Sequence, residues 1–178
     1  DDPIPYSIST DMIFSQLLRR IPGTENWYSG LRYAFTRSNV TFDKETNPEF
    51  PTVTNNATTS SLGVVTSYDS RDNNYYPTQG SLFDLAWVAN DDALGSDFNF
   101  RKLTSFYNYY SPVSEKSVVA LRANIADANG NVPFYLLPTL RLRGFPAGRY
   151  KDNSMLSGHA EWRHKPIPRW GYILFFEA

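Results

Sequence analysis

The stretch Leu62-Gly63-Val64-Val65-Thr66-Ser67-Tyr68-Asp69 alternates between larger side chains and smaller or more polar ones. Leu62, Val64, Thr66 and Tyr68 have one parity, and the residues between them have the other. Because successive side chains of an extended chain point to opposite faces, a period of two predicts a β-strand with one apolar face.

The same alternation recurs along the chain. It predicts eight strands, near residues 6–20, 27–38, 61–72, 81–90, 97–110, 117–127, 154–164 and 171–178. The first of them has an alternative, a short helix capped by Asp11 with Ile13, Leu17 and Ile21 on one side. The predicted fold class is therefore all-β.

The predicted connections are of two kinds. Short ones with turn residues cover 22–26, 73–80, 112–116 and 165–169, and longer polar ones cover 39–60, 90–96 and 129–153. The Asn-, Thr- and Ser-rich stretch 52–61 is interpreted as a mobile loop. Strict alternation of short and long connections is typical of an antiparallel up-and-down barrel of the outer-membrane type.

The composition fits such a barrel. Twelve Tyr, twelve Phe and four Trp accompany a negative mean hydropathy of −0.44, as expected where an apolar outer band with aromatic girdles encloses a polar lumen. Soluble β-sandwiches share part of this profile. No run approaches the ~20 apolar residues of a spanning helix. A net charge of −1 argues against a nucleic-acid surface, and the lack of Cys excludes disulfides and thiolate metal sites.

The chain begins Asp1-Asp2-Pro3, without Met or a signal peptide, so we expect an interior segment of a longer protein. No linker marks a second domain, and residues 1–178 are predicted to form a single partial barrel domain.

The tetrapeptide Leu142-Arg143-Gly144-Phe145 lies in the irregular segment 129–153. An arginine followed by a glycine with a free φ and an aromatic residue suggests a loop tip that packs against another surface. Glu161 and Glu177 could receive the guanidinium. Glu161 alternates with Ala160 and Trp162, so its side chain is expected on the polar face of its strand.

Two segments resemble the barrels of the BamA/TamA bacterial surface-antigen family. The first runs from Gly63 to Gly80, and its matching residues are Gly63, Tyr68, Asp69, Arg71, Asp72, Asn73, Pro77 and Gly80. The second is Leu142-Arg143-Gly144-Phe145, followed by Glu161-Trp162-Arg163. The resemblance extends from about Trp27 to Ala178. One departure is Glu177, where the family often has Asp, and the sequence ends before the glycine expected soon after it.

The resemblance implies an antiparallel up-and-down transmembrane barrel, of about sixteen strands, to which this segment contributes roughly the sixth to the thirteenth. It implies that Arg143 lies on an extracellular loop folded into the lumen and contacts Glu161 and Glu177. It also implies a bacterial outer-membrane protein without a cofactor or enzymatic activity, involved in outer-membrane protein assembly or polypeptide translocation. Its partners would be the lipid bilayer, unfolded or secreted polypeptides and a periplasmic POTRA-type module or accessory proteins, not nucleic acid.

Two alternatives belong to other functional classes. The barrel could anchor a patatin-like lipase or another surface enzyme whose catalytic domain lies outside these residues. The chain could also be a soluble all-β sandwich that binds sugars through its aromatic side chains.

Other polar groups make weaker candidates. Asp91, Asp92 and Asp97 lack the dense spacing of a calcium loop, so solvated charges are expected there. His159 and His164 are an odd number of residues apart, which places them on opposite faces of a strand, a poor metal pair. Ser154 or Ser157 with His159 and Asp152 lacks the strand-turn-helix context of a catalytic nucleophile. Asp69 and Arg71 are expected to form a local ion pair at a strand end, before a turn that contains Pro77 and Gly80.

Overall fold

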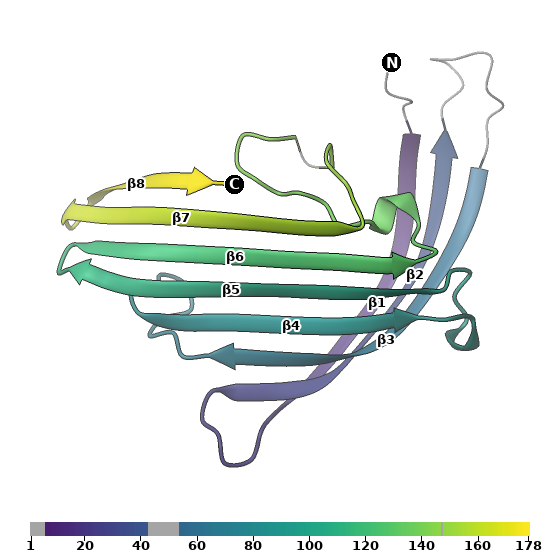
Figure 1. Cartoon of the computed structure of the whole chain (residues 1–178), viewed down its shortest axis with the longest axis horizontal. Helices are drawn as coiled ribbons and strands as arrows, with labels where there is room; N and C mark the ends of the chain where they lie inside the picture. The colour runs from purple at the N-terminus through teal and green to yellow at the C-terminus, as the bar shows by residue number, and fades with distance from the viewer. Residues whose placement is uncertain (1–5, 43–53, 147) are drawn as a thin grey trace.

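The computed structural model describes residues 6–42, 54–146 and 148–178, which form one antiparallel sheet of eight strands in chain order (Figure 1). The strands are β1 (Tyr6–Arg20), β2 (Trp27–Phe42), β3 (Thr54–Asp69), β4 (Gly80–Asn90), β5 (Phe100–Ser114), β6 (Ser117–Gly130), β7 (Ser154–Ile167) and β8 (Trp170–Glu177). Each pairs with the next, and β1 and β8 are the two edges, so the curved sheet is open. The predicted fold class is confirmed. A single sheet also rules out the two-sheet sandwich.

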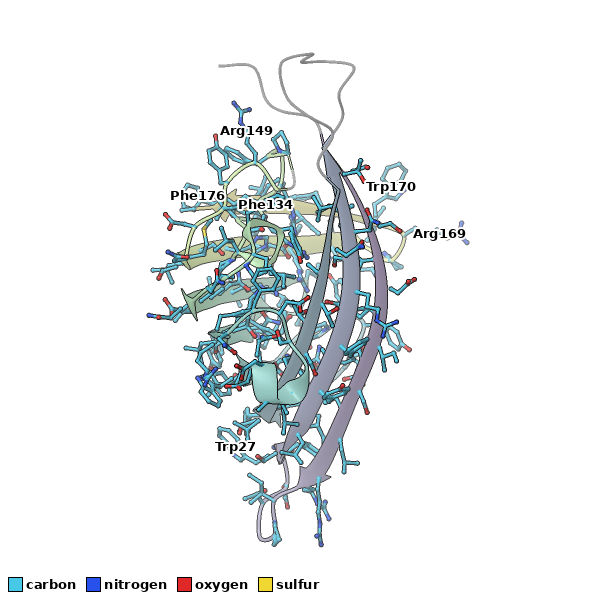
Figure 2. The ribbon with its side chains drawn as sticks, turned by 90° about the vertical axis from the view of Figure 1, so that its right-hand side faces the viewer. Trp27, Phe134, Arg149, Arg169, Trp170 and Phe176 are labelled. Atoms are coloured by element: carbon cyan, nitrogen blue, oxygen red, sulfur yellow. The ribbon has the colours of Figure 1, made fainter. Side chains whose placement is uncertain are left out.

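The sheet has an apolar face and a polar face, as the period of two predicts. Leu31, Val64 and Trp87 are register partners across β2, β3 and β4, and all three are exposed on the apolar face. Arg32, Gly63 and Val88 occupy the next register row and belong to the polar face. Side chains extend from both sides of the ribbon (Figure 2).

Aromatic side chains gather at one end of the sheet. Trp27 lies 5.0 Å from Tyr68 and 6.3 Å from Phe83 between ring centroids, near the connections 21–26 and 70–79. Trp162 lies 5.6 Å from Tyr172 near the β7–β8 turn. These rings occupy the end of the strands opposite to the segment 131–153.

The first element is a strand, not the alternative helix. β1 pairs with β2 without interruption from Tyr6 to Arg20. An extended backbone places Ile13 and Leu17 in the same rows as Phe35 and Leu31. This continues the apolar face of the sheet, which a helix could not do.

The interpretation of residues 54–61 as a mobile loop is wrong, and residues 52 and 53 lie outside the described residues. Strand β3 begins at Thr54 and pairs with β2 from there on. Thr59 and Ser60 are buried, and the hydroxyl oxygens of Thr36 and Thr59 lie 2.5 Å apart. Because the strand satisfies these hydroxyls across the sheet, a polar composition does not prevent it.

Two of the predicted turns are shorter than expected. β5 continues through Pro112 to a turn at Glu115 and Lys116, and β7 continues through Pro166 to a turn at Pro168 and Arg169. The register shifts between Pro112 and Ser114, and between His164 and Ile167. A bulge tolerates the missing N–H of proline, so the strand need not end there.

The strict alternation of short and long connections is also wrong. The connections 70–79 and 91–99 are of similar length, because β3 ends at Asp69 and β5 starts only at Phe100. The second contains a 3₁₀ turn, η1 (Asp92–Leu94), and the segment 131–153 contains another, η2 (Phe134–Leu136). Within the described ranges, no helix has the length and apolar character to cross a membrane.

Candidate functional site

Segment 131–153, which joins β6 to β7, is folded back on itself and is called the docked loop below (Figure 1). Its two arms meet in a bridge between Thr139 and Lys151, and the Leu140 N–H donates to the Tyr150 carbonyl at 3.0 Å. Lys102 of β5 donates to the Leu136 carbonyl at 2.7 Å. Backbone pairing and this lysine fix the base of the loop, which leaves the tip to be positioned by its own contacts.

The tip is the tetrapeptide Leu142-Arg143-Gly144-Phe145. The Phe145 N–H donates to the Leu142 carbonyl at 3.3 Å and closes a turn. Gly144 has a φ of 81°, a conformation that residues with a side chain rarely adopt. The glycine thus reverses the chain directly after Arg143.

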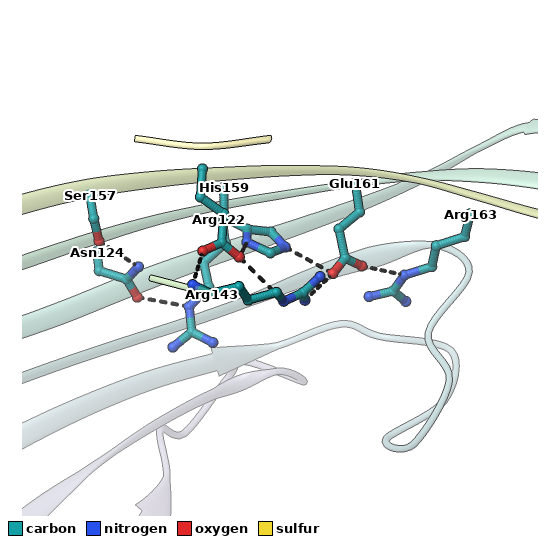
Figure 3. A network of polar contacts seen from close by, with 8 residues as sticks. Arg122, Asn124, Arg143, Ser157, His159, Glu161 and Arg163 are labelled. Carbon is teal, nitrogen blue, oxygen red and sulfur yellow. Dashed lines mark hydrogen bonds and ion pairs between the residues drawn. The ribbon is translucent and has the colours of Figure 1, made fainter. Parts of the chain in front are cut away.

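Arg143 contacts the carboxylates of β7 and β8 on the polar face (Figure 3). Its Nη2 donates to Glu161 Oε1, its Nε lies 3.3 Å from Glu177 Oε1, and its backbone N–H donates to Glu177 Oε2 at 2.5 Å. The guanidinium also lies 4.5 Å from the ring centroid of Phe175. The structure therefore brings together the three residues that the sequence singled out.

Two further residues of β7 complete the cluster, and the sequence analysis named both without predicting their contacts with Glu161 and Glu177. His159 Nε2 lies 2.9 Å from Glu161 Oε1, and His159 Nδ1 lies 2.6 Å from Glu177 Oε1. Arg163 Nε donates to Glu161 Oε2 at 2.7 Å. The signal was present, because residues two apart on a strand share a face and Glu161 stands between His159 and Arg163.

The two carboxylates are the least exposed members of this cluster, and Glu161 is buried. Glu161 and Glu177 side chains are 5% and 9% exposed, whereas the Arg143 side chain is 48% exposed. A buried carboxylate is costly unless its oxygens are paired, and Glu161 is paired through both of them. Loss of the ion pairs is therefore expected to cost the two shielded carboxylates more free energy than the half-exposed Arg143.

The residues between Gly63 and Gly80 that resemble the family motif lie outside this cluster, and their contacts are local to the end of β3 and the connection 70–79. Asp69 and Arg71 form a two-bond ion pair, with Nε–Oδ1 and Nη2–Oδ2 distances of 2.9 and 2.8 Å. Asn73 Oδ1 accepts from the N–H groups of Tyr75 and Tyr76, and Pro77 is buried. A Cβ on Gly80, whose φ is 96°, would lie 2.2 Å from the Ser70 carbonyl oxygen. These contacts close the connection 70–79.

The connection 70–79 is nevertheless linked indirectly to the docked loop, because Arg163 contacts both Tyr76 and Glu161. The Arg163 guanidinium lies 5.7 Å from the ring centroid of Tyr76 and 5.5 Å from that of Tyr110. Arg163 also binds Glu161, the main acceptor of Arg143. A chain of contacts therefore runs between connections at opposite ends of the strands.

Asp72 organises the connection 70–79 and provides a pH-dependent test. The Thr78 hydroxyl donates to Asp72 Oδ2 at 2.5 Å and the Thr78 N–H donates to Oδ1 at 2.9 Å; these bonds hold the pKa of Asp72 below its usual range. A lowered pKa stabilises the folded connection above the unfolded value of about 3.9, and the effect is lost as pH falls through the folded pKa. We expect Asp72→Asn to speed amide hydrogen exchange at Thr78 and Gln79 at pH 7. The difference from wild type should vanish well below pH 4, and an unchanged exchange rate at pH 7 would contradict this.

A cavity of about 930 Å³ lies between the docked loop and the polar face of β5 to β8. The loop contributes Arg141, Leu142 and Phe145 to its lining, and the strands contribute Asn108 and Arg122. Arg122 donates through Nε to Asn124 at 2.7 Å, and Asn124 donates to Ser157 at 3.1 Å (Figure 3). The loop therefore does not fill the polar face completely.

The weaker candidates are not assembled into sites. Asp91 Oδ1 caps η1 by accepting from the Ala93 N–H, and Asp97 Oδ2 accepts from the Thr58 N–H. Ser154 donates to Asp127, so neither it nor Ser157 forms a nucleophile pair with His159. In the part of the chain that the structure describes, no group of three or more His, Asp or Glu side chains is placed to hold a metal ion.

Comparison with known proteins gives a family and a similar fold. A family model described as the Omp85 superfamily domain matches residues 5–164. The fold is similar to the crystal structure of BamA from Haemophilus ducreyi lacking POTRA domains 1–3, with a TM-score of 0.73 and 18% sequence identity. The match covers 97% of this chain and 41% of that one, so the chain spans less than half the length of this relative. A search of curated proteins gave no match. By the extent of the family match, the chain belongs to the Omp85 superfamily.

Proposed function

We propose that this chain forms eight strands of a larger, sixteen-stranded barrel in the bacterial outer membrane. The barrel would act without enzymatic chemistry in outer-membrane protein assembly or in polypeptide translocation. Membership of the Omp85 superfamily carries this proposal. The two open edges of the sheet are consistent with further strands on either side, because unpaired edges favour added strands.

The distribution of side chains supports a membrane position. The apolar face exposes Leu31, Val64, Leu121, Leu156 and Leu174, which in water would be an aggregation-prone surface. The aromatic rings at one end of the strands fit a membrane–water girdle. The polar face, with the buried Glu161 and the neighbouring Glu177, would then line the lumen.

Within this proposal the docked loop is a brace inside the lumen. It ties the connection between β6 and β7 to β7 and β8 through Arg143. The two carboxylates are largely shielded from water, which makes their ion pairs stronger than pairs at an open surface. A rigid wall on this side would leave conformational change to other strands of the barrel.

Arg143→Ala tests the brace. The substitution removes one partner of each carboxylate and leaves only His159 and Arg163 beside them. We expect a loss of about 2 kcal/mol of barrel stability, less than the roughly 3–5 kcal/mol for breaking a fully buried pair, because Arg143 is half exposed. The measurement is the fraction of heat-resistant folded barrel on gels of the complete protein.

Arg149→Ala is the matched control, since Arg149 belongs to the same loop but projects away from the sheet (Figure 2). Its guanidinium lies 5.8 Å from the ring centroid of Tyr150, its neighbour in the loop. Wild-type levels of folded barrel in the Arg143 variant would argue against the brace.

The function itself is tested by reconstituting the complete protein in liposomes and adding an unfolded outer-membrane barrel as client. Protease-protected, heat-modifiable client should accumulate only in the presence of the protein. The alternative role as anchor of a patatin-like lipase predicts ester hydrolysis by the complete protein and no acceleration of client insertion.

A further inference from the structure

The cavity under the docked loop has an excess of positive charge. Five cationic side chains line it, Arg122, Arg141, Arg143, Lys151 and Arg163, together with two carboxylates, Glu161 and Glu177. Arg143 and Arg163 are committed to those carboxylates. Both carboxylates are therefore engaged by these two arginines, and they do not neutralise Arg122 or Arg141.

Two of these cations face the cavity without a carboxylate. Arg122 uses its Nε for Asn124 and makes no ion pair with the described residues, and its guanidinium lies 5.1 Å from the ring centroid of Phe106. Arg141 has no hydrogen bond or ion pair to any residue within the described ranges. One is on the strand wall and the other on the loop, so an anion between them would be held from two sides.

A buried amide beside Arg122 supplies an independent observation. Asn108 is the register partner of Arg122 across β5 and β6, and its side chain lines the cavity although the residue is only 8% exposed. Its Oδ1 is buried and accepts no hydrogen bond from the described residues. Because a buried acceptor without a donor costs free energy, a ligand that brings a donor to this point would be favoured.

The remaining lining is apolar and aromatic. Leu142, Phe145 and Tyr110 line the cavity beside the cations. A phosphorylated saccharide would leave these surfaces unused, whereas a polypeptide carries carboxylates, apolar side chains and backbone N–H donors together. The volume of about 930 Å³ lies within the range of ordinary ligand sites.

We propose that this cavity binds a short acidic segment of an extended polypeptide. Carboxylates of the segment contact Arg122 and Arg141, a backbone N–H donates to Asn108 Oδ1, and apolar side chains pack on Phe145 and Leu142. This inference rests on the proposed function, since it specifies which part of a client the lumen holds. The docked loop is then one side of a client site as well as a brace.

The test uses the complete protein in lipid nanodiscs and two fluorescein-labelled hexapeptides, one alternating Glu and Val and the other alternating Gln and Val. Fluorescence anisotropy should report binding of the glutamate peptide and not of the glutamine peptide. Binding should weaken as salt rises, because exposed charge interactions are screened. The peptide comparison needs no protein variant, so it stands even where a substitution impairs folding.

Protein variants locate the site. We expect Arg122→Gln and Arg141→Gln each to weaken binding of the glutamate peptide about tenfold, the value of one charge-assisted hydrogen bond. Arg122→Lys and Arg141→Lys should retain more of the binding than the Gln variants. Arg149→Gln, in the same loop but outside the cavity lining, should bind like wild type.

The proposal is overturned by equal binding of the two peptides, by equal weakening by Arg149→Gln, or by binding of glucose 1,6-bisphosphate with no binding of the glutamate peptide. Client insertion is measured on the same preparations. If wild-type protein inserts a client but binds neither peptide, the site is wrong and the function stands. If it inserts none, the proposed function fails, whatever the peptides do.

Discussion

Glu161→Gln should lower barrel stability more than any other single substitution in the cluster around the docked loop, by about 3 kcal/mol. Glu161 receives Arg143 and His159 at one carboxylate oxygen and Arg163 at the other. Glutamine has the same shape but removes the charge, and its amide group turns a donor toward Arg143 or Arg163. The remaining carboxylate, Glu177, cannot balance both arginines. Urea titration of the folded, heat-resistant fraction of the complete protein measures the loss.

Glu115→Gln is the matched control for this experiment. Glu115 lies in the exposed turn between β5 and β6, where loss of a charge should change stability by less than 0.5 kcal/mol. The Glu161 variant should also expose the docked loop to protease, because the loop loses its main acceptor. A midpoint equal to that of the Glu115 variant, with the loop still protected, would show that the cluster is not the support of the loop.

Part of this cluster could be predicted from the sequence because its members lie in recognisable motifs. Arg143 stands before a glycine with positive φ, and Glu161 has the parity of the polar face. Tyr76 could not be found in this way. Its approach to Arg163 depends on how the connection 70–79 folds across the sheet, and hydrophobic periodicity says nothing about the path of a connection.

The ends of the strands were harder to predict than their existence, because the ends depend on contacts with neighbouring strands. The hydroxyls of Thr59 and Ser60 are buried within the sheet, so a polar run there is still a strand. Pro112 and Pro166 lie at register shifts, where a missing donor is tolerated. In each case the end of the strand is determined by pairing with a neighbouring strand, which the local amino-acid composition does not reveal.

Gly63→Ala is the second substitution with a large expected effect, and it gives a glycine of the strand–turn segment a physical reason. A Cβ at Gly63 would lie 2.1 Å from the Trp87 carbonyl oxygen and 2.6 Å from the Val88 Cα. Both are backbone atoms, so no side-chain rotation relieves the overlap, and β4 must move away from β3. Overpacking of this kind costs about 1–3 kcal/mol, and we expect the upper part of that range. Urea unfolding followed by tryptophan fluorescence measures the cost, because Trp87 itself is displaced.

Gly158→Ala separates this close approach from the general effect of replacing glycine in a strand. Gly158 lies on β7, and a Cβ there would meet no atom of the described residues within 4 Å. Alanine at such a position narrows the unfolded ensemble without a clash, so stability should be unchanged or slightly higher. If the two variants unfold at the same urea concentration, β3 and β4 are not in the contact that the structure gives them. If only Gly63→Ala is destabilised, the glycine is required because two strand backbones meet at that point.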